Sequence, residues 1–196
     1  MAIGAHTILG GDATIPPSFA RNPASGSAAE HAIPIESPPR MPFVAPTPWS
    51  AERPNALVVC CSDGRWHAQM MEFVRAEVCS RADLYAVPGG PAVLDPWNST
   101  FDEARAFEEG MRLFEKHHDL ESVWLIAHEG CAFYREKHPH YEISALRRRQ
   151  VEDLSRARKM VLERHPRMDV RLIFASRREE VVLFDPCDSE AAEEKP

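Results

Sequence analysis

Two kinds of segment alternate along most of this chain, and their hydrophobic patterns differ. Short runs of β-branched and other apolar residues are typical of buried strands, whereas longer segments with apolar residues at helical spacing indicate helices. The strand-like runs cover residues 56–61, 83–87, 122–128, 169–175 and 180–184, and the helix-like segments cover 67–78, the stretch from the candidate N-caps Ser99 and Thr100 to about 116, and 143–165. This alternation predicts an α/β fold with an open, mostly parallel sheet of four to five strands and helices on both faces.

The two ends of the chain lack this alternation. Residues 1–50 are rich in Pro, Ala, Ser and Gly, and their proline pairs leave no room for a helix. We interpret them as an extended arm, which is either a disordered tail or a segment packed on its own domain or on a neighbouring subunit. Residues 51–187 then form the α/β domain, and residues 188–196 form an acidic, solvated tail.

Composition narrows the class of protein. A chain of 196 residues with 44% hydrophobic and 27% charged residues is typical of one soluble domain. The net charge of −7 argues against nucleic acid or an anionic membrane surface as partner, and no apolar run is long enough to span a membrane. The N-terminus lacks the positive region of a signal peptide, so we expect a cytoplasmic protein.

The cysteines fit that compartment, because an odd number of them argues against a disulfide framework. The five are Cys60, Cys61, Cys79, Cys131 and Cys187. Cys60 and Cys79 are expected in the core and Cys187 as a bystander, which leaves Cys61 and Cys131 as candidate ligands. In a reducing cytoplasm their thiols stay available for a metal.

The residues with the clearest chemistry follow two of the predicted strands. Cys61 ends the first strand, and His128 ends the third, with Cys131 three residues beyond it. Ligands of open α/β sheets lie beyond the carboxyl ends of the strands, where the strand order reverses. If the first strand lies between the second and the third, these side chains meet there. Two thiolates and an imidazole are three zinc ligands with a fourth position open, as in a catalytic site.

Asp63 and Arg65 come two and four residues after Cys61. The carboxylate of Asp63 can ligate the fourth position directly or orient a zinc-bound water. Arg65 stays protonated and its planar fork can hold a carboxylate in a bidentate pair. The two residues together therefore predict control over what occupies the open position.

These two motifs resemble those of the β-class carbonic anhydrases, which carry Cys-x-Asp-x-Arg after the first strand and His-x-x-Cys after the third. The matching residues are Cys61, Asp63, Arg65, His128 and Cys131, within a resemblance that runs from about Leu57 to Phe184. It implies a zinc enzyme in which zinc-bound hydroxide attacks carbon dioxide to give bicarbonate, Asp63 accepts a hydrogen bond from the hydroxide and Arg65 fixes Asp63. It also implies a homodimer or a higher homo-oligomer.

Two stretches depart from the family pattern. The family's Arg-Asn-Ala-Gly-Asn after the second strand is replaced by Val87–Pro91, and its His-Thr-x-Cys-Gly becomes His128-Glu129-Gly130-Cys131-Ala132. These changes alter the pocket lining and leave the substrate open between carbon dioxide and the related carbonyl sulfide or carbon disulfide. A non-catalytic, zinc-stabilised interaction protein is the alternative from another class.

Overall fold

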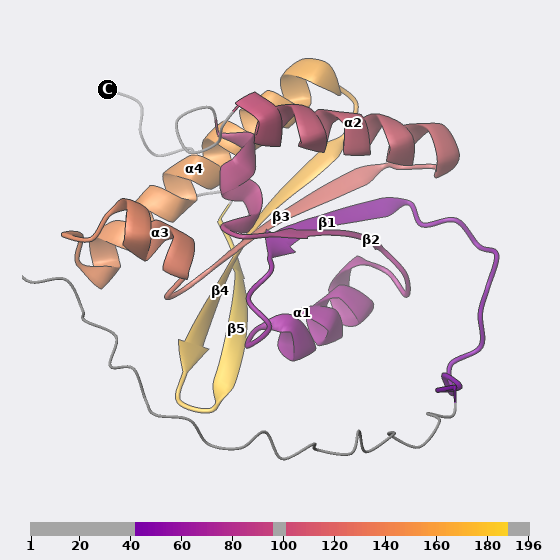
Figure 1. The fold of residues 1–196 in the computed structure, drawn as a ribbon, viewed down its shortest axis with the longest axis horizontal. Coiled ribbons are helices and arrows are strands. Elements are labelled where there is room, and N and C mark those ends of the chain that lie inside the picture. Colours follow the sequence, from indigo (N-terminus) through magenta and orange to yellow (C-terminus); the bar gives the residue numbers. More distant parts are fainter. Residues whose placement is uncertain (1–41, 96–100, 188–196) are drawn as a thin grey trace, which may run out of the picture. The chain divides into compact units, whose positions relative to one another are not determined.

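The computed structural model describes residues 42–95 and 101–187 (Figure 1). The chain divides into two units, Met1–Pro48 and Trp49–Pro196, and every element described below belongs to the second. Most of the predicted arm, the N-cap candidates Ser99 and Thr100, and the acidic tail lie outside the described residues. The division of the chain into arm, domain and tail stays a prediction.

The second unit is built on one five-stranded sheet with the strand order β2-β1-β3-β4-β5. The strands are β1 (Ala56–Cys61), β2 (Asp83–Val87), β3 (Ser122–His128), β4 (Asp169–Arg178) and β5 (Val181–Pro186). The first four run parallel, and β5 returns antiparallel to β4. This confirms the predicted α/β class, and β1 lies between β2 and β3, which is the condition under which the candidate ligands were expected to meet.

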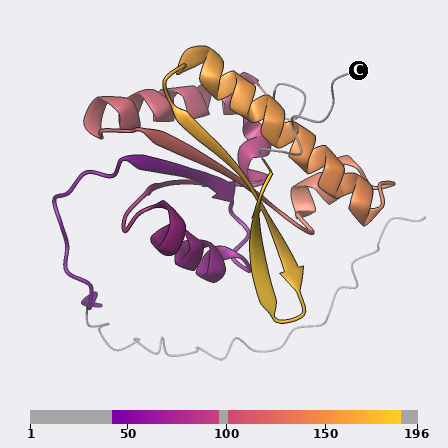
Figure 2. The same ribbon diagram turned by 180° about the vertical axis from the view of Figure 1, so that it is seen from behind.

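Helices cover both faces of the sheet, as predicted. Figures 1 and 2 show α2 and α4 on one face and α1 on the other. The elements are α1 (His67–Phe73), its π-helical continuation η1 (Val74–Val78), the 3-10 helix η2 (Gly90–Leu94), α2 (Phe101–His117), α3 (Ala132–Lys137) and α4 (Ile143–Arg164). The pattern did not predict η2 or α3, because each is too short to show a helical period. None of the described helices is long and apolar enough to cross a membrane.

The core consists of two apolar layers separated by the sheet. One layer lies under α2 and α4 and includes Leu57, Val59 and Phe174; the other lies under α1 and includes Val58 and Cys60. All six residues of β1 are buried. A central parallel strand that is covered on both faces must be apolar throughout, which explains why β1 reads as an unbroken hydrophobic run.

Buried charges attach η2 to α4. Asp95, the residue after η2, and Asp153 in α4 are 0% and 1% exposed. Arg156 Nε donates a hydrogen bond of 2.8 Å to Asp95, and Arg156 also pairs with Asp153. Asp153 in turn accepts a hydrogen bond from the buried Tyr134 of α3. Because isolated charges are costly in a core, this network favours a single placement of η2, α3 and α4.

Candidate metal centre

Three predicted ligands meet at the carboxyl ends of β1 and β3. Cys61 is the last residue of β1, His128 is the last of β3, and Cys131 immediately precedes α3. Gly130, with φ of +68°, makes the turn between His128 and Cys131 in a backbone conformation that favours glycine. The Sγ atoms of the two cysteines are 3.9 Å apart, and all three ligand atoms lie within 4.8 Å of one another. The three residues are buried.

His128 is held in the tautomer that a metal requires. Its Nδ1 lies 2.9 Å from the carbonyl oxygen of Glu129 and donates a hydrogen bond to it. The lone pair of a neutral imidazole is then on Nε2, which is buried and has no hydrogen-bond partner in the described part of the chain. The Trp66 ring packs against the imidazole with centroids 4.8 Å apart. A buried acceptor without a donor is costly, and a metal ion at Nε2 removes that cost.

The two candidate ligand thiols differ in acidity. The pKa of Cys61 is lowered to about 4, chiefly by a hydrogen bond from the Cys131 thiol, with contributions from the backbone N–H groups of Asp63 and Gly89. The same contact raises the pKa of Cys131. Burial raises the pKa of the adjacent Cys60 to about 12, so that thiol keeps its proton. The centre therefore presents a buried thiolate, which favours a cation between the three side chains.

Asp63 and Arg65 form the predicted bidentate pair. Arg65 Nε lies 2.9 Å from Asp63 Oδ1 and Arg65 Nη2 lies 2.5 Å from Oδ2, while the backbone N–H of Arg65 donates to Oδ1 at 3.1 Å. These bonds from Arg65 lower the pKa of Asp63 to about 2. The Asp63 side chain is 17% exposed and that of Arg65 is 73% exposed. Asp63 is thus an anion with a fixed orientation, two residues from the candidate ligand Cys61.

The loop after β2 belongs to the centre; the sequence predicted that it lines the pocket, but not that its backbone contacts Cys61. The Gly89 N–H donates to Cys61. A Cβ at Gly90 would lie 2.7 Å from the backbone nitrogen of Cys61, and one at Gly89 would lie 2.7 Å from the Phe133 ring. Both glycines have positive φ. Adjacent glycines between two prolines were the available signal, since a backbone that approaches another backbone closely needs residues without Cβ.

The remaining cysteines differ in part from expectation. Cys60 is fully buried, as predicted. Cys79, expected in the core, is only half-buried, and its thiol donates to the carbonyl oxygen of Arg81. Cys187, expected to be a bystander, is 1% exposed and packs in the core under α2 and α4. It lies just after β5, where its backbone N–H bonds the carbonyl of Leu172, and this pairing could not be read from a local pattern.

Known proteins resemble the chain only distantly. It matches no protein-family model and no curated protein. Among solved structures it is similar to the β-carbonic anhydrase CcaA, with 14% identity over 68% of this chain and 74% of that chain and a TM-score of 0.43. It is similar to the β-carbonic anhydrase CafA of Aspergillus fumigatus, with 13% identity over 68% of this chain and 76% of that chain and a TM-score of 0.43. It is also similar to β-carbonic anhydrase isoform I of Trichomonas vaginalis, with 9% identity over 70% of this chain and 86% of that chain and a TM-score of 0.46.

Proposed function

We propose that this protein is a zinc-dependent carbonic anhydrase that interconverts carbon dioxide and bicarbonate. The observation that carries the proposal is the buried Cys61–His128–Cys131 cluster beside the bidentate Asp63–Arg65 pair. The cluster alone would suit a structural or a catalytic metal. A fixed carboxylate next to a three-ligand set favours a catalytic one, because a purely structural zinc has four protein ligands and needs no such group.

The donor set suits Zn²⁺. Cys61 and Cys131 would hold it through their Sγ atoms and His128 through Nε2, a mixed nitrogen and sulfur set that zinc accepts. When bound, the ion supplies a Lewis acid that makes water nucleophilic near neutral pH. The hydrogen bond from His128 Nδ1 to Glu129 orients the imidazole for this role.

Asp63 would position the proton of the attacking water. A carboxylate has about four lone-pair sites. Arg65 holds both oxygens through four contacts: its Nη2 bonds Oδ2, its backbone N–H bonds Oδ1, and its Nε lies within hydrogen-bond distance of both. Because the two oxygens share the one Nε hydrogen, these contacts use three donor hydrogens, which leaves one acceptor site for a water or for the hydroxyl of bicarbonate. By fixing Asp63, Arg65 also keeps the carboxylate from taking the place of the substrate at the metal.

The experiment is a stopped-flow assay of carbon dioxide hydration on the zinc-loaded protein, with zinc content measured on the same sample. We expect about one zinc per chain and a hydration rate that Asp63→Asn lowers by ~10²-fold or more. Full zinc without hydration contradicts the proposal, and sulfide release from carbonyl sulfide or carbon disulfide would then identify the alternative substrates. Silence in both assays would favour the zinc-stabilised interaction protein. Light scattering on the same sample tests the proposed homodimer or larger homo-oligomer.

A further inference from the structure

A cleft of about 480 Å³ opens beside the metal centre. Its walls come from the start of α1 (Trp66 and Gln69), the turn after β3, the start of α4, and the β4–β5 hairpin. Arg65 and Gly130, both next to the residues of the candidate centre, belong to its lining. The volume lies in the usual range of pockets for small organic ligands and greatly exceeds what carbon dioxide or bicarbonate requires.

The cleft carries charges of both signs that do not neutralise one another. Its lining contains three arginines and three glutamates. Two of the six are already engaged: Arg65 binds Asp63, and Glu129 accepts a hydrogen bond from the backbone N–H of Arg177. The four that remain are Arg135, Arg177, Glu179 and Glu180. Within the described residues, the side chains of these four form no ion pair or hydrogen bond.

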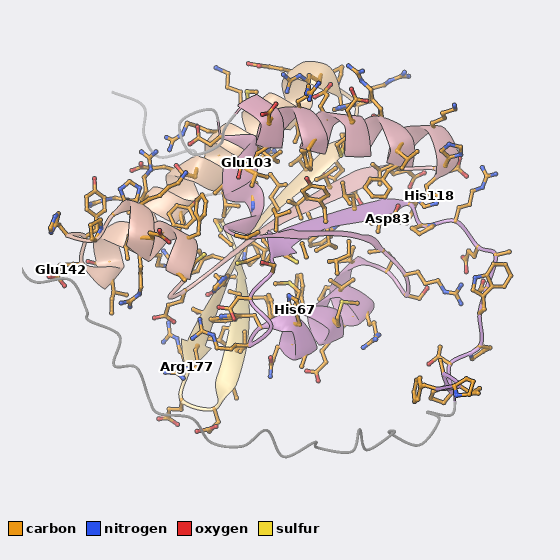
Figure 3. All side chains as sticks on the ribbon, in the orientation of Figure 1. His67, Asp83, Glu103, His118, Glu142 and Arg177 are labelled. Atoms are coloured by element: carbon orange, nitrogen blue, oxygen red, sulfur yellow. The ribbon has the colours of Figure 1, made fainter. Side chains whose placement is uncertain are left out.

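The arginines come from two elements, whereas both glutamates come from one turn. Arg135 is anchored in α3, where its backbone N–H bonds the carbonyl of Cys131 at 3.2 Å, and Arg177 is in β4. Figure 3 labels Arg177 near the C-terminal end of this strand, close to the hairpin turn. Glu179 and Glu180 form the turn of the hairpin, just beyond β4. The guanidinium groups therefore come from α3 and from the hairpin end of β4, and the carboxylates come from the turn itself, which begins two residues after Arg177.

Apolar side chains lie between these charges. Trp66, Ile143 and Val182 belong to the same lining. Val182 pairs with Arg177 across the two strands, so both side chains lie on one face of the hairpin. A ligand that matches this surface has an apolar body, a carboxylate for the arginines and an ammonium group for the glutamates.

We propose that this cleft binds a small zwitterion of the amino-acid type, with its carboxylate between Arg135 and Arg177 and its ammonium group toward Glu179 and Glu180. This ligand site goes beyond the proposed hydration reaction. Its test measures binding without turnover, so it can fail while hydration succeeds, and the reverse. Guanidinium groups favour carboxylates because two parallel hydrogen bonds can form.

The experiment is calorimetric titration of the full-length protein with three compounds that share one phenylethyl body. L-phenylalanine carries both charges, 3-phenylpropionate only the carboxylate, and 2-phenylethylamine only the ammonium group. We expect L-phenylalanine to bind about fivefold more tightly than either of the others, the scale of one partly exposed charge pair. Equal affinities for the three compounds, or no binding of L-phenylalanine at millimolar concentration, would overturn the proposal.

Variants assign the two ends of the ligand. The double variant Arg135→Gln with Arg177→Gln should bind L-phenylalanine about fivefold or more less tightly than wild type. Its affinity for 2-phenylethylamine should not fall. The double variant Glu179→Gln with Glu180→Gln should lower the affinity for L-phenylalanine, and its affinity for 3-phenylpropionate should not fall. Arg178→Gln is the matched control, because Arg178 is the exposed neighbour of Arg177 and is absent from the lining. An equal loss in Arg178→Gln would show a general charge effect and contradict the site. Melting temperatures within a few degrees of wild type show that the variants are folded.

Discussion

Adjacent residues of one type can have opposite roles at the end of a strand. Cys60 and Cys61 are consecutive in β1, and the pleat sends their side chains to opposite faces of the sheet. Cys60 joins the apolar layer under α1, where burial raises its pKa to about 12. Cys61 faces Cys131, and the hydrogen bond from that thiol lowers its pKa to about 4. One position along the strand thus separates a core side chain from a thiolate that can bind a metal.

The role of Asp63 can be tested by separating zinc binding from turnover. Asp63→Asn should keep the zinc, because Asp63 is not among the three clustered ligands, and lower hydration by ~10²-fold or more through loss of a positioned proton acceptor. Arg65→Ala should have a similar effect, since the carboxylate loses its fixed orientation. Arg65→Lys should recover only part of the rate, because an ammonium group cannot form the bidentate pair.

Zinc content, melting temperature and hydration rate should be measured together on the three variants. If Asp63 only supports the fold, activity will follow the fraction of folded protein. Turnover at the wild-type rate in zinc-loaded Asp63→Asn would mean that the carboxylate has no part in the reaction.

The Asp63–Arg65 ion pair should make the stability of the protein depend on pH in the acid range. The bonds from Arg65 hold the pKa of Asp63 at about 2, below the ordinary value of about 4. Because the folded-state pKa is depressed, the stabilisation is fully present above about pH 4 and is lost as the pH falls toward 2. We expect ¹³C NMR of the Asp63 carboxyl to show its inflection near pH 2, and Arg65→Ala to move that inflection upward toward the ordinary value. An inflection that does not move in Arg65→Ala would show that the pair is not the cause of the low pKa.

At the scale of elements, the start of η2 lies against the end of β1, because Gly90 approaches the backbone of Cys60 and Cys61 closely. Gly90→Ala places a Cβ within 2.7 Å of the Cys61 nitrogen and 2.8 Å of the Cys60 carbonyl carbon, at a φ of +55°. The loop or the end of β1 must then shift. We expect a loss of about 2 kcal/mol or more in the free energy of unfolding, together with weaker zinc binding. Chemical denaturation and metal competition measure the two effects.

Two other glycines provide matched controls for Gly90. Gly130 has a φ of +68° but nothing within 4 Å of its Cβ position, so Gly130→Ala measures the cost of the backbone conformation alone. Gly64 has open space and no positive φ, so Gly64→Ala should be close to neutral. A Gly90→Ala loss no larger than that of Gly130→Ala would show that close approach to β1 contributes nothing.

The elements also show which features the sequence could predict. The buried strands and the long helices α2 and α4 follow from local hydrophobic period, and their alternation predicted the sheet. The point where the candidate ligands meet followed only on the condition that the first strand lies between the second and the third. The contacts of Gly89 and Gly90 with β1, the core position of Cys187 and the ionic network of Asp95 and Asp153 join segments far apart in sequence. Such contacts produce no periodic pattern in the local sequence. The adjacent glycines indicate a close backbone approach, but the partner segment is known only from the folded chain.

At the scale of the whole molecule, the candidate centre brings together segments that are far apart in the sequence. Its candidate ligands come from β1, from β3 and from the turn before α3, and His128 comes 67 positions after Cys61. A metal ion that joins them binds only the folded chain, so its binding free energy adds to the free energy of unfolding. The hydrophobic layers on either side of the sheet supply the rest of the stability without the metal.

Removal of the metal should therefore lower the melting temperature of the whole domain. At a free zinc concentration about 1,000-fold above Kd, binding contributes about 4 kcal/mol, which for a domain of this size corresponds to roughly 10 °C. Calorimetry of the wild type with and without a chelator measures this shift. Cys61→Ser should melt near the chelated wild type and should no longer respond to the chelator. Cys60→Ala is the matched control: it loses stability through the core but should keep the full response. A wild type that melts at the same temperature with and without chelator would contradict the assignment of Cys61, His128 and Cys131 as metal ligands.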